Sequence, residues 1–335
     1  MKASRSNKCT SCSFLMSAPC SGGISFFGFL ILAATGVWLA QFYHPTPGTA
    51  RESVVYIMNV APLGDVVRGI HFWVANIVMA TVLLHLGRVF VTGAYKRPRE
   101  ANWLIGLGLL AVTLGLIFTG TVLKWDQEGF EALGHNIEIG NLLGGLGFWF
   151  SPEFAGRISI LLRLYGAHVV IIPGIILVLL VLHLLLVKRH RMSPHPLLPA
   201  GTSSEQAAEG EPTQPFTRHI RRLVAFGIAL AGILGVLAVL FPAPIGSTPV
   251  PGIEITKPPW MFWWPFTLEN WFGLSAIVWG ELVFFFLLAV LPFVDRGPER
   301  WWRRRPVAMG IALVVLAVLT VLTILMAITP AEVHL

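Results

Sequence analysis

The sequence predicts an all-α, polytopic membrane protein with seven transmembrane helices. Of the 335 residues, 55% are hydrophobic and only 12% are charged, and the mean hydropathy is +0.72, a composition typical of membrane proteins. The apolar residues form long stretches with at most one charged residue each, and about 20 such residues cross a bilayer core. These stretches are residues 21–50, 69–87, 101–123, 164–187, 223–253, 270–294 and 306–331.

Two of these stretches, 21–50 and 223–253, are longer than one span needs. Each contains prolines in its second half, namely Pro45 and Pro47 in the first and Pro242, Pro244 and Pro249 in the second. Because proline lacks an N–H and clashes with the preceding turn, we expect both helices to end before these positions.

The basic residues predict the orientation. With a cytoplasmic N-terminus, eighteen of the 24 Lys and Arg flank the helices on the inside. Since basic residues favour cytoplasmic loops, the N-terminus is expected in the cytoplasm and the C-terminus on the outer side. The net charge of +7 then faces lipid head groups, and no nucleic-acid partner is expected.

Four histidines lie deep inside two apolar stretches. His71 and His85 are fourteen residues apart, and His168 and His183 are fifteen apart. At 1.5 Å rise and 100° per residue, each pair is ~21–22 Å apart along its helix and returns to nearly one face. Polar groups inside a membrane are usually functional, and neutral imidazole is an axial ligand of haem iron. The pattern predicts two haems clamped between two helices.

Glycines repeat with a matching period. Gly22 and Gly36 are fourteen residues apart, and so are Gly106 and Gly120. A glycine lets the backbone approach a flat macrocycle closely, so these four positions are predicted to pack against haem. Plain packing between membrane helices is the alternative explanation for small residues at such positions.

A change in composition divides the chain. Residues 193–217 are polar and rich in Pro, Ser, Gly and Glu, which is typical of a flexible linker. We therefore expect a cytoplasmic tail, a four-helix haem-binding domain, a cytoplasmic linker and a three-helix domain. Their predicted bounds are 1–19, 20–190, 191–218 and 219–335.

Several motifs resemble those of cytochrome b6 and subunit IV of b6f complexes. HLGRVFVTGAYKRPREANW at 85–103, LKWDQ at 123–127 and RLYGAH at 163–168 resemble cytochrome b6. PPWMFWWPFTLENWFGL at 258–274, with FVDR and RRRPVA after it, resembles subunit IV. The two parts would be fused here, as they are in the longer cytochromes b of bc1 complexes.

The resemblance implies the cytochrome b subunit of a quinol:cytochrome c or plastocyanin oxidoreductase, active within a multisubunit complex. It implies two b-haems that carry electrons across the membrane in a proton-translocating Q-cycle. With the predicted topology, His71 pairs with His168 at the outer haem and His85 with His183 at the inner haem. The implied partners are quinone, a Rieske iron–sulfur protein, a c-type cytochrome and a second copy of the chain.

Basic residues near the histidines match positively charged positions of the family. Arg68, Arg88 and Arg163 lie three to five residues from a histidine, and the resemblance implies that they neutralise haem propionates. Interfacial snorkelling is the alternative. Three further basic residues are expected beside the inner haem and the inner quinone site: Lys96, Arg97 and Lys188.

Cys20 opens the string CSGGIS, which resembles the b6 segment whose cysteine carries a third haem through a single thioether. The resemblance implies a covalently bound haem c at Cys20, whereas an inert apolar cysteine is the alternative. Cys9 and Cys12 form a CxxC without the histidine of a c-type attachment motif, so we expect no cofactor there.

The quinol-oxidising loop departs from the family pattern. Relatives usually read Pro-Glu-Trp-Tyr with a proton-accepting glutamate, whereas this chain reads Pro258, Pro259, Trp260 and Met261. The candidates for another proton acceptor are Glu254, Glu269 and Asp126. Ordinary solvation at the membrane interface is the alternative role for these acids.

Two other classes stay open at this point. A di-haem cytochrome b anchor of a hydrogenase or dehydrogenase would reduce quinone without bifurcating electrons, but it would not need the three-helix second half. A transporter with incidental histidines is expected to contain inverted repeats, and the sequence shows none. Fusion of the two halves favours the cytoplasmic membrane of a prokaryote over a chloroplast.

Overall fold

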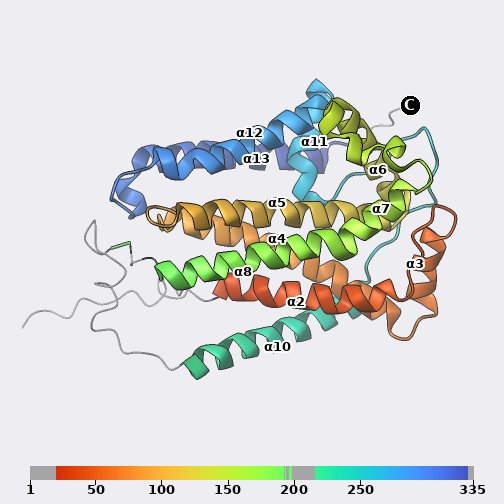
Figure 1. The fold of residues 1–335 in the computed structure, drawn as a ribbon, viewed down its shortest axis with the longest axis horizontal. Helices are drawn as coiled ribbons and strands as arrows, with labels where there is room; N and C mark the ends of the chain where they lie inside the picture. Colours follow the sequence, from red (N-terminus) through yellow and green to blue (C-terminus); the bar gives the residue numbers. More distant parts are fainter. Residues whose placement is uncertain (1–19, 192, 194–195, 198–215, 331–335) are drawn as a thin grey trace, which may run out of the picture.

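The chain forms a bundle of long helices with shorter helices gathered at one end (Figure 1). The computed structural model describes residues 20–191, 193, 196–197 and 216–330, and these ranges contain no β-strand. The long helices are α2 (Cys20–Ala40), α4 (Gly64–Val91), α5 (Glu100–Leu123), α7 (Ile160–Gly166) continued by η4 (Ala167–Ile171) and α8 (Ile172–His190), α10 (Phe216–Leu240), α12 (Ser275–Val294) and α13 (Pro306–Ile328). The shorter ones are α3 (Ala50–Asn59), α6 (Gln127–Leu142), η1 (Gly144–Leu146), η2 (Phe148–Phe150), η3 (Pro152–Ala155), η5 (Trp260–Phe262), α11 (Trp263–Phe272) and η6 (Trp302–Arg304).

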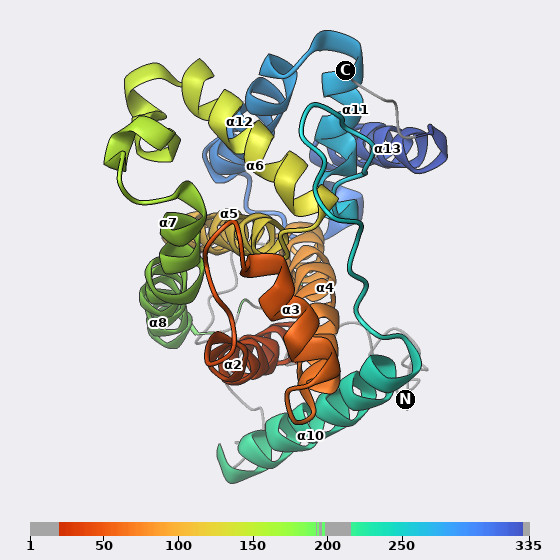
Figure 2. The same ribbon diagram turned by 90° about the vertical axis from the view of Figure 1, so that its right-hand side faces the viewer.

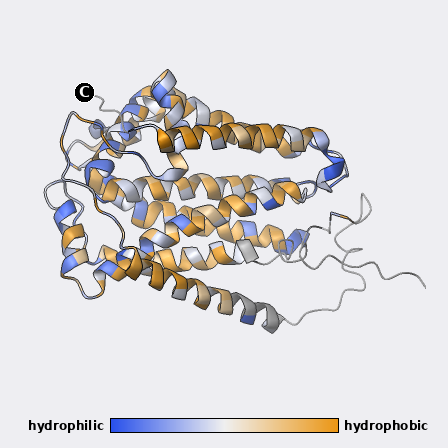
Figure 3. Cartoon of the chain, turned by 180° about the vertical axis from the view of Figure 1, so that it is seen from behind, coloured by the Kyte–Doolittle hydropathy of each residue, from blue (hydrophilic) through white to orange (hydrophobic). Residues whose placement is uncertain are grey.

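The predicted all-α, membrane-spanning fold is confirmed. Six helices of the described residues are long and apolar enough to cross a membrane. The seventh, α10, has a shorter apolar stretch, Val224–Leu240, whose length reaches the lower end of the range for a span. Figure 3 shows hydrophobic residues along the helices and hydrophilic ones at both ends of the bundle.

Prolines and apolar patterning explain where the first helix of each half ends. α2 ends at Ala40, before Pro45, and α10 ends at Leu240, just before Pro242. The apolar stretches continue past these points as loops, the first of which leads into the short helix α3.

The helices are arranged in packed pairs (Figure 2). α2 packs against α4, and α5 packs against α8. α10 lies against both α2 and α4, and α12 lies against α5, so the second half of the chain flanks the first. The α4–α10 contact is close: a Cβ on Gly69 would lie 2.8 Å from the Cβ of Ala238.

We name the two ends of the bundle after the predicted topology. The outer end carries α3, α6 and α11, and the inner end carries the loops at 92–99 and 295–305 (Figure 1). His71 lies near the outer end of α4, and His85 lies near the inner end.

Candidate functional site

The four intramembrane histidines meet in two pairs. The ring centres of His71 and His168 are 6.4 Å apart, with 58° between the ring planes. Those of His85 and His183 are 6.5 Å apart at 69°. A ring nitrogen lies about 2 Å from a metal, so with roughly 1 Å more to each ring centre, two imidazoles on opposite sides of one metal ion have centres about 6 Å apart. Both pairs therefore fit bis-histidine coordination of a haem iron.

A π-helical turn aligns the second helix with the first. His168 lies in η4, a π-helix over Ala167–Ile171, and Pro173 follows at the start of α8. A π-turn accommodates one extra residue, so the fifteen-residue spacing from His168 to His183 acts like fourteen on a regular helix. Because of this extra residue, His168 and His183 have the same separation along their helix as His71 and His85 have on α4.

Each predicted glycine lies against one of these histidines. A Cβ at Gly36 of α2 would lie 3.4 Å from Cε1 of His71, and one at Gly22 would lie 3.6 Å from Cε1 of His85. On α5, the corresponding distances are 3.0 Å from Gly120 to His168 and 3.7 Å from Gly106 to His183. A Cβ at Gly120 would be tight against its imidazole, whereas at the other three positions it would reach only ordinary contact distance, so the steric role of glycine is clearest at Gly120.

Two threonines that the sequence reasoning missed contact the outer pair. Oγ1 of Thr35 lies 2.9 Å from Nδ1 of His71, and Oγ1 of Thr119 lies 2.9 Å from Nδ1 of His168. Both threonines directly precede a glycine of the repeat, Gly36 or Gly120. The Thr-Gly sequence that occurs in both helices is the signal from which these two threonines could have been predicted.

The similarity to known proteins decides the family. The family model described as "Cytochrome b(N-terminal)/b6/petB" matches residues 76–248. A "Cytochrome bc complex cytochrome b subunit" from Chlorobaculum thiosulfatiphilum is 32% identical over 318 residues, which cover 88% of this chain and 70% of that protein. The chain belongs to the cytochrome b/b6 family. Membership in the cytochrome b family implies b-type haem, and the two histidine pairs fit that cofactor.

Two further similarities cover different shares of the chain. "Cytochrome b6" from Heliobacterium modesticaldum is 39% identical over 173 residues, which cover 50% of this chain and 81% of that protein. The solved structure of a "Hyperthermophilic respiratory Complex III" chain covers 92% of this chain and 84% of its own, with a TM-score of 0.75 and 23% identity. The fold of that chain thus extends over both halves, consistent with a b6-like part fused to a subunit IV-like part.

The predicted outer arginines hold loops of the outer end. Arg68 donates to the carbonyl oxygens of Ala243 and Pro244, at 2.7 and 2.6 Å. Arg163 donates to those of Trp149 and Ser151, at 2.8 and 2.6 Å. These bonds anchor backbone segments beside the outer histidine pair.

Of the basic residues predicted near the inner haem, Lys96 is the most constrained. Its ammonium group donates to Oδ1 of Asp295 at 2.7 Å and to the carbonyl oxygens of Gly297 and Glu299 at 2.9 and 2.8 Å. Its three N–H groups thus have acceptors in the second half of the chain, which favours a role in joining the halves over the predicted one beside the haem.

The other inner basic residues differ in exposure. Arg88 is half-buried in the last turn of α4, three residues after His85. The side chain of Arg97 is 80% exposed and pairs with Glu100 at 3.2 Å, and Lys188 is exposed in the last turn of α8.

The cysteines fall at the margin of the structure. Cys9 and Cys12 lie outside the described residues, and of Cys20 only the backbone is described, as the first residue of α2. That position is two residues before Gly22, which faces His85.

The Pro258–Met261 loop packs against the middle of α4 and α5. Nε1 of Trp260 donates to Oδ1 of Asn76 on α4 at 2.8 Å. Met261 is buried against Met79 of α4 and Leu110 of α5. The loop predicted to oxidise quinol therefore contacts α4 between its two histidines.

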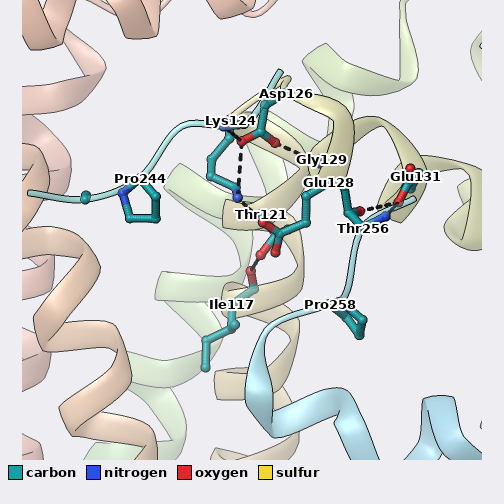
Figure 4. A network of polar contacts seen from close by, with 12 residues as sticks. Ile117, Thr121, Lys124, Asp126, Glu128, Gly129, Glu131, Pro244, Thr256 and Pro258 are labelled. Atoms are coloured by element: carbon teal, nitrogen blue, oxygen red, sulfur yellow. Dashed lines mark hydrogen bonds and ion pairs between the residues drawn. The ribbon is translucent and has the colours of Figure 1, made fainter. Parts of the chain in front are cut away.

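Side chains at the start of helix α6 hold the segment that leads to this loop (Figure 4). Asp126 caps α6 by accepting from the N–H of Gly129 at 3.0 Å, and its other oxygen accepts from the N–H of Gly246 at 2.7 Å. Glu131 accepts from the N–H groups of Ile255 and Thr256 at 2.8 and 3.1 Å. Both oxygens of Asp126 are engaged in holding backbone, which argues against the predicted role as proton acceptor.

The remaining acids converge on a histidine that the sequence reasoning missed. Nε2 of His135 on α6 lies 3.0 Å from Oε1 of Glu269 on α11, and both side chains are mostly buried. Burial lowers the pKa of His135, but the hydrogen bond to Glu269 and its negative charge outweigh this and raise the pKa to about 9. Glu254 adds a smaller raising contribution through its charge. This raised pKa favours the imidazolium form of His135 at neutral pH.

Proposed function

We propose that this chain is the cytochrome b subunit of a bc-type quinol:cytochrome c oxidoreductase, which carries electrons across the membrane through two b-haems in a Q-cycle. Two histidine pairs at two depths of one bundle carry the proposal. The ring centres lie 6.4 Å apart in one pair and 6.5 Å apart in the other. A "Menaquinol:cytochrome c reductase cytochrome b subunit" from Bacillus subtilis is 35% identical over 179 residues, covering 52% of this chain and 80% of that protein.

In this proposal, His71 and His168 would hold the outer haem, and His85 and His183 would hold the inner one. Bound there, the two haems would supply one-electron carriers between the two membrane faces. Quinol is oxidised beside the loop of Pro258, Pro259, Trp260 and Met261, and one electron leaves to a Rieske protein while the other crosses inward to reduce quinone.

The proton of the quinol needs an acceptor because Pro259 stands in place of the acid of the motif. We propose Glu269, whose Oε1 lies 3.0 Å from Nε2 of His135, and Glu254 as the second candidate. Glu269→Gln is expected to slow quinol oxidation severely while both b-haem spectra stay intact. Unchanged turnover in both Glu269→Gln and Glu254→Gln would remove these two acids from the mechanism.

At the inner end we propose a third haem bound through one thioether to Cys20, with Arg88, Arg97 and Lys188 as the nearby positive charges. A thioether survives denaturation, whereas histidine coordination does not. Haem stain is therefore expected to follow the chain on a denaturing gel, to persist in the Cys9→Ser/Cys12→Ser double variant and to vanish in Cys20→Ser. Wild-type protein from its own host without stain would refute this assignment.

The proposed setting is a prokaryotic cytoplasmic membrane, with the N-terminus inside and the C-terminus outside. The proposed assembly is a homodimer with a Rieske protein and a c-type cytochrome. A non-bifurcating di-haem anchor would have no bound Rieske protein. Co-purification of a Rieske protein with the chain therefore distinguishes the proposed assembly from this alternative.

Visible spectroscopy of histidine variants tests the core of the proposal. His71→Ala and His168→Ala are expected to remove the same b-haem, and His85→Ala and His183→Ala the other. Loss of the same haem from His71→Ala and His183→Ala would contradict the pairing. A purified wild-type chain without b-haem would contradict the function itself.

A further inference from the structure

The two outer histidines share a hydrogen-bonding arrangement built from a threonine on the neighbouring helix. Oγ1 of Thr35 on α2 lies 2.9 Å from Nδ1 of His71 and 2.7 Å from the carbonyl oxygen of Ile31. Oγ1 of Thr119 on α5 lies 2.9 Å from Nδ1 of His168 and 2.8 Å from the carbonyl oxygen of Gly115.

Counting protons determines the direction of these bonds. A hydroxyl group has one proton, and the carbonyl oxygen four residues earlier can only accept it. The threonine oxygen therefore has lone pairs left for Nδ1, so the histidine donates its Nδ1–H. Since a neutral imidazole carries one N–H, Nε2 keeps its lone pair. Both outer histidines are thus held as the tautomer that binds a metal through Nε2.

The inner pair lacks this arrangement on at least one helix. The residues before Gly22 and Gly106, which face the inner histidines, are Ser21 and Ile105. Ile105 has no hydroxyl group, so α5 offers His183 no threonine like Thr119, and the acceptor on α5 for His183 is the backbone of Asn102.

We propose that Thr35 and Thr119 are positioning residues that lower the reduction potential of the outer haem. An imidazole that donates its second N–H becomes a more basic ligand, and a more basic ligand stabilises the oxidised iron. The threonines thereby favour electron flow from the outer haem to the inner one. This inference rests on the proposed function, in which the histidine pairs bind haem.

Redox titration of the b-haem bands in the purified complex tests the inference. Thr35→Val and Thr119→Val keep the shape of the side chain and remove the hydroxyl group. Each is expected to raise the midpoint potential of the outer haem, and the double variant to raise it further. The equilibrium constant for sharing one electron between the two haems should then shift several-fold toward the outer haem. The midpoint potential of the inner haem should stay unchanged.

Two controls separate the hydroxyl group from general packing. Thr35→Ser keeps the hydroxyl and is expected to keep the wild-type potential. Thr113→Val on α5 removes a buried hydroxyl that bonds only to the carbonyl oxygen of Leu109 among the bonds described for it, and it should leave both potentials unchanged.

Each outcome of the experiment has a separate meaning. Unchanged potentials in Thr35→Val and Thr119→Val, or equal shifts of both haems, would overturn the inference while the b-haems and the proposed function stand. Loss of the outer haem alone would support it, because the hydroxyl would then be needed to present Nε2. If one variant does not assemble, the other tests the same point on a different helix. A wild-type complex without b-haem would instead remove the proposed function.

Discussion

At the scale of single residues, Gly120 leaves the least space of the four glycines that face the paired histidines. A Cβ there would lie 3.0 Å from Cε1 of His168, tighter than an ordinary contact. We predict that Gly120→Ala displaces this imidazole and weakens or shifts the absorption band of the outer haem, leaving the inner band unchanged. Gly115→Ala on the same helix is the control, because its Cβ would meet only Cδ1 of Ile172, at 3.9 Å. A wild-type outer band in Gly120→Ala would show that the site tolerates a methyl group.

The buried pair of His135 and Glu269 predicts a pH dependence of stability. The pKa of His135 is raised to about 9 in the folded protein, above its ordinary value of about 6.5. The contribution of this pair to the stability of the folded protein is therefore fully present below pH ~6.5 and is lost as the pH rises through about 9. Glu269→Gln should lower the thermal midpoint by several degrees at pH 6.5, since removing one partner of a buried pair costs about 3 kcal/mol. The difference from wild type should shrink toward pH 10, and a constant difference would contradict the ion pair.

At the scale of elements, α6 acts as the support of the segment that leads to the Pro258–Met261 loop. Glu131 accepts from two backbone N–H groups of that segment, and leaving a buried donor without a partner costs about 1–3 kcal/mol. We predict that Glu131→Ala slows quinol oxidation several-fold while both b-haem spectra stay intact. Glu138→Ala, on the exposed face of the same helix, should have no effect. Equal rates in the two variants would show that α6 does not position the loop.

At the scale of the whole molecule, a buried polar cluster joins the two halves at the inner end. Lys96 pairs with Asp295 at 2.7 Å, and Arg305 pairs with the same carboxylate at 3.1 Å. Tyr95 also donates to it. We predict that two fragments divided within residues 198–210 and produced together remain associated during purification. Lys96→Ala should weaken that association, whereas Arg97→Ala, at the exposed neighbour, should not. If the fragments separate with Lys96 intact, the cluster and the helix contacts are not sufficient to hold the two halves together.

Local periodicity determined much of this molecule. Apolar stretches predicted the membrane helices, and prolines predicted where α2 and α10 end. The spacings of the histidines and glycines followed from helix geometry, and the structure places these residues opposite one another. Such features depend on neighbours a few turns away along one chain segment, which is why a sequence without coordinates displays them.

Contacts between distant segments were decided only by the tertiary structure. The fifteen-residue spacing of His168 and His183 matches the other pair because of a π-turn, which a count at 100° per residue does not contain. His135 meets Glu269, 134 residues away, and Lys96 meets Asp295, 199 residues away. Hydropathy shows that such groups need partners when buried, but it does not name them. The partner is set by how the helices pack, because packing alone brings polar groups from different parts of the chain within hydrogen-bonding distance.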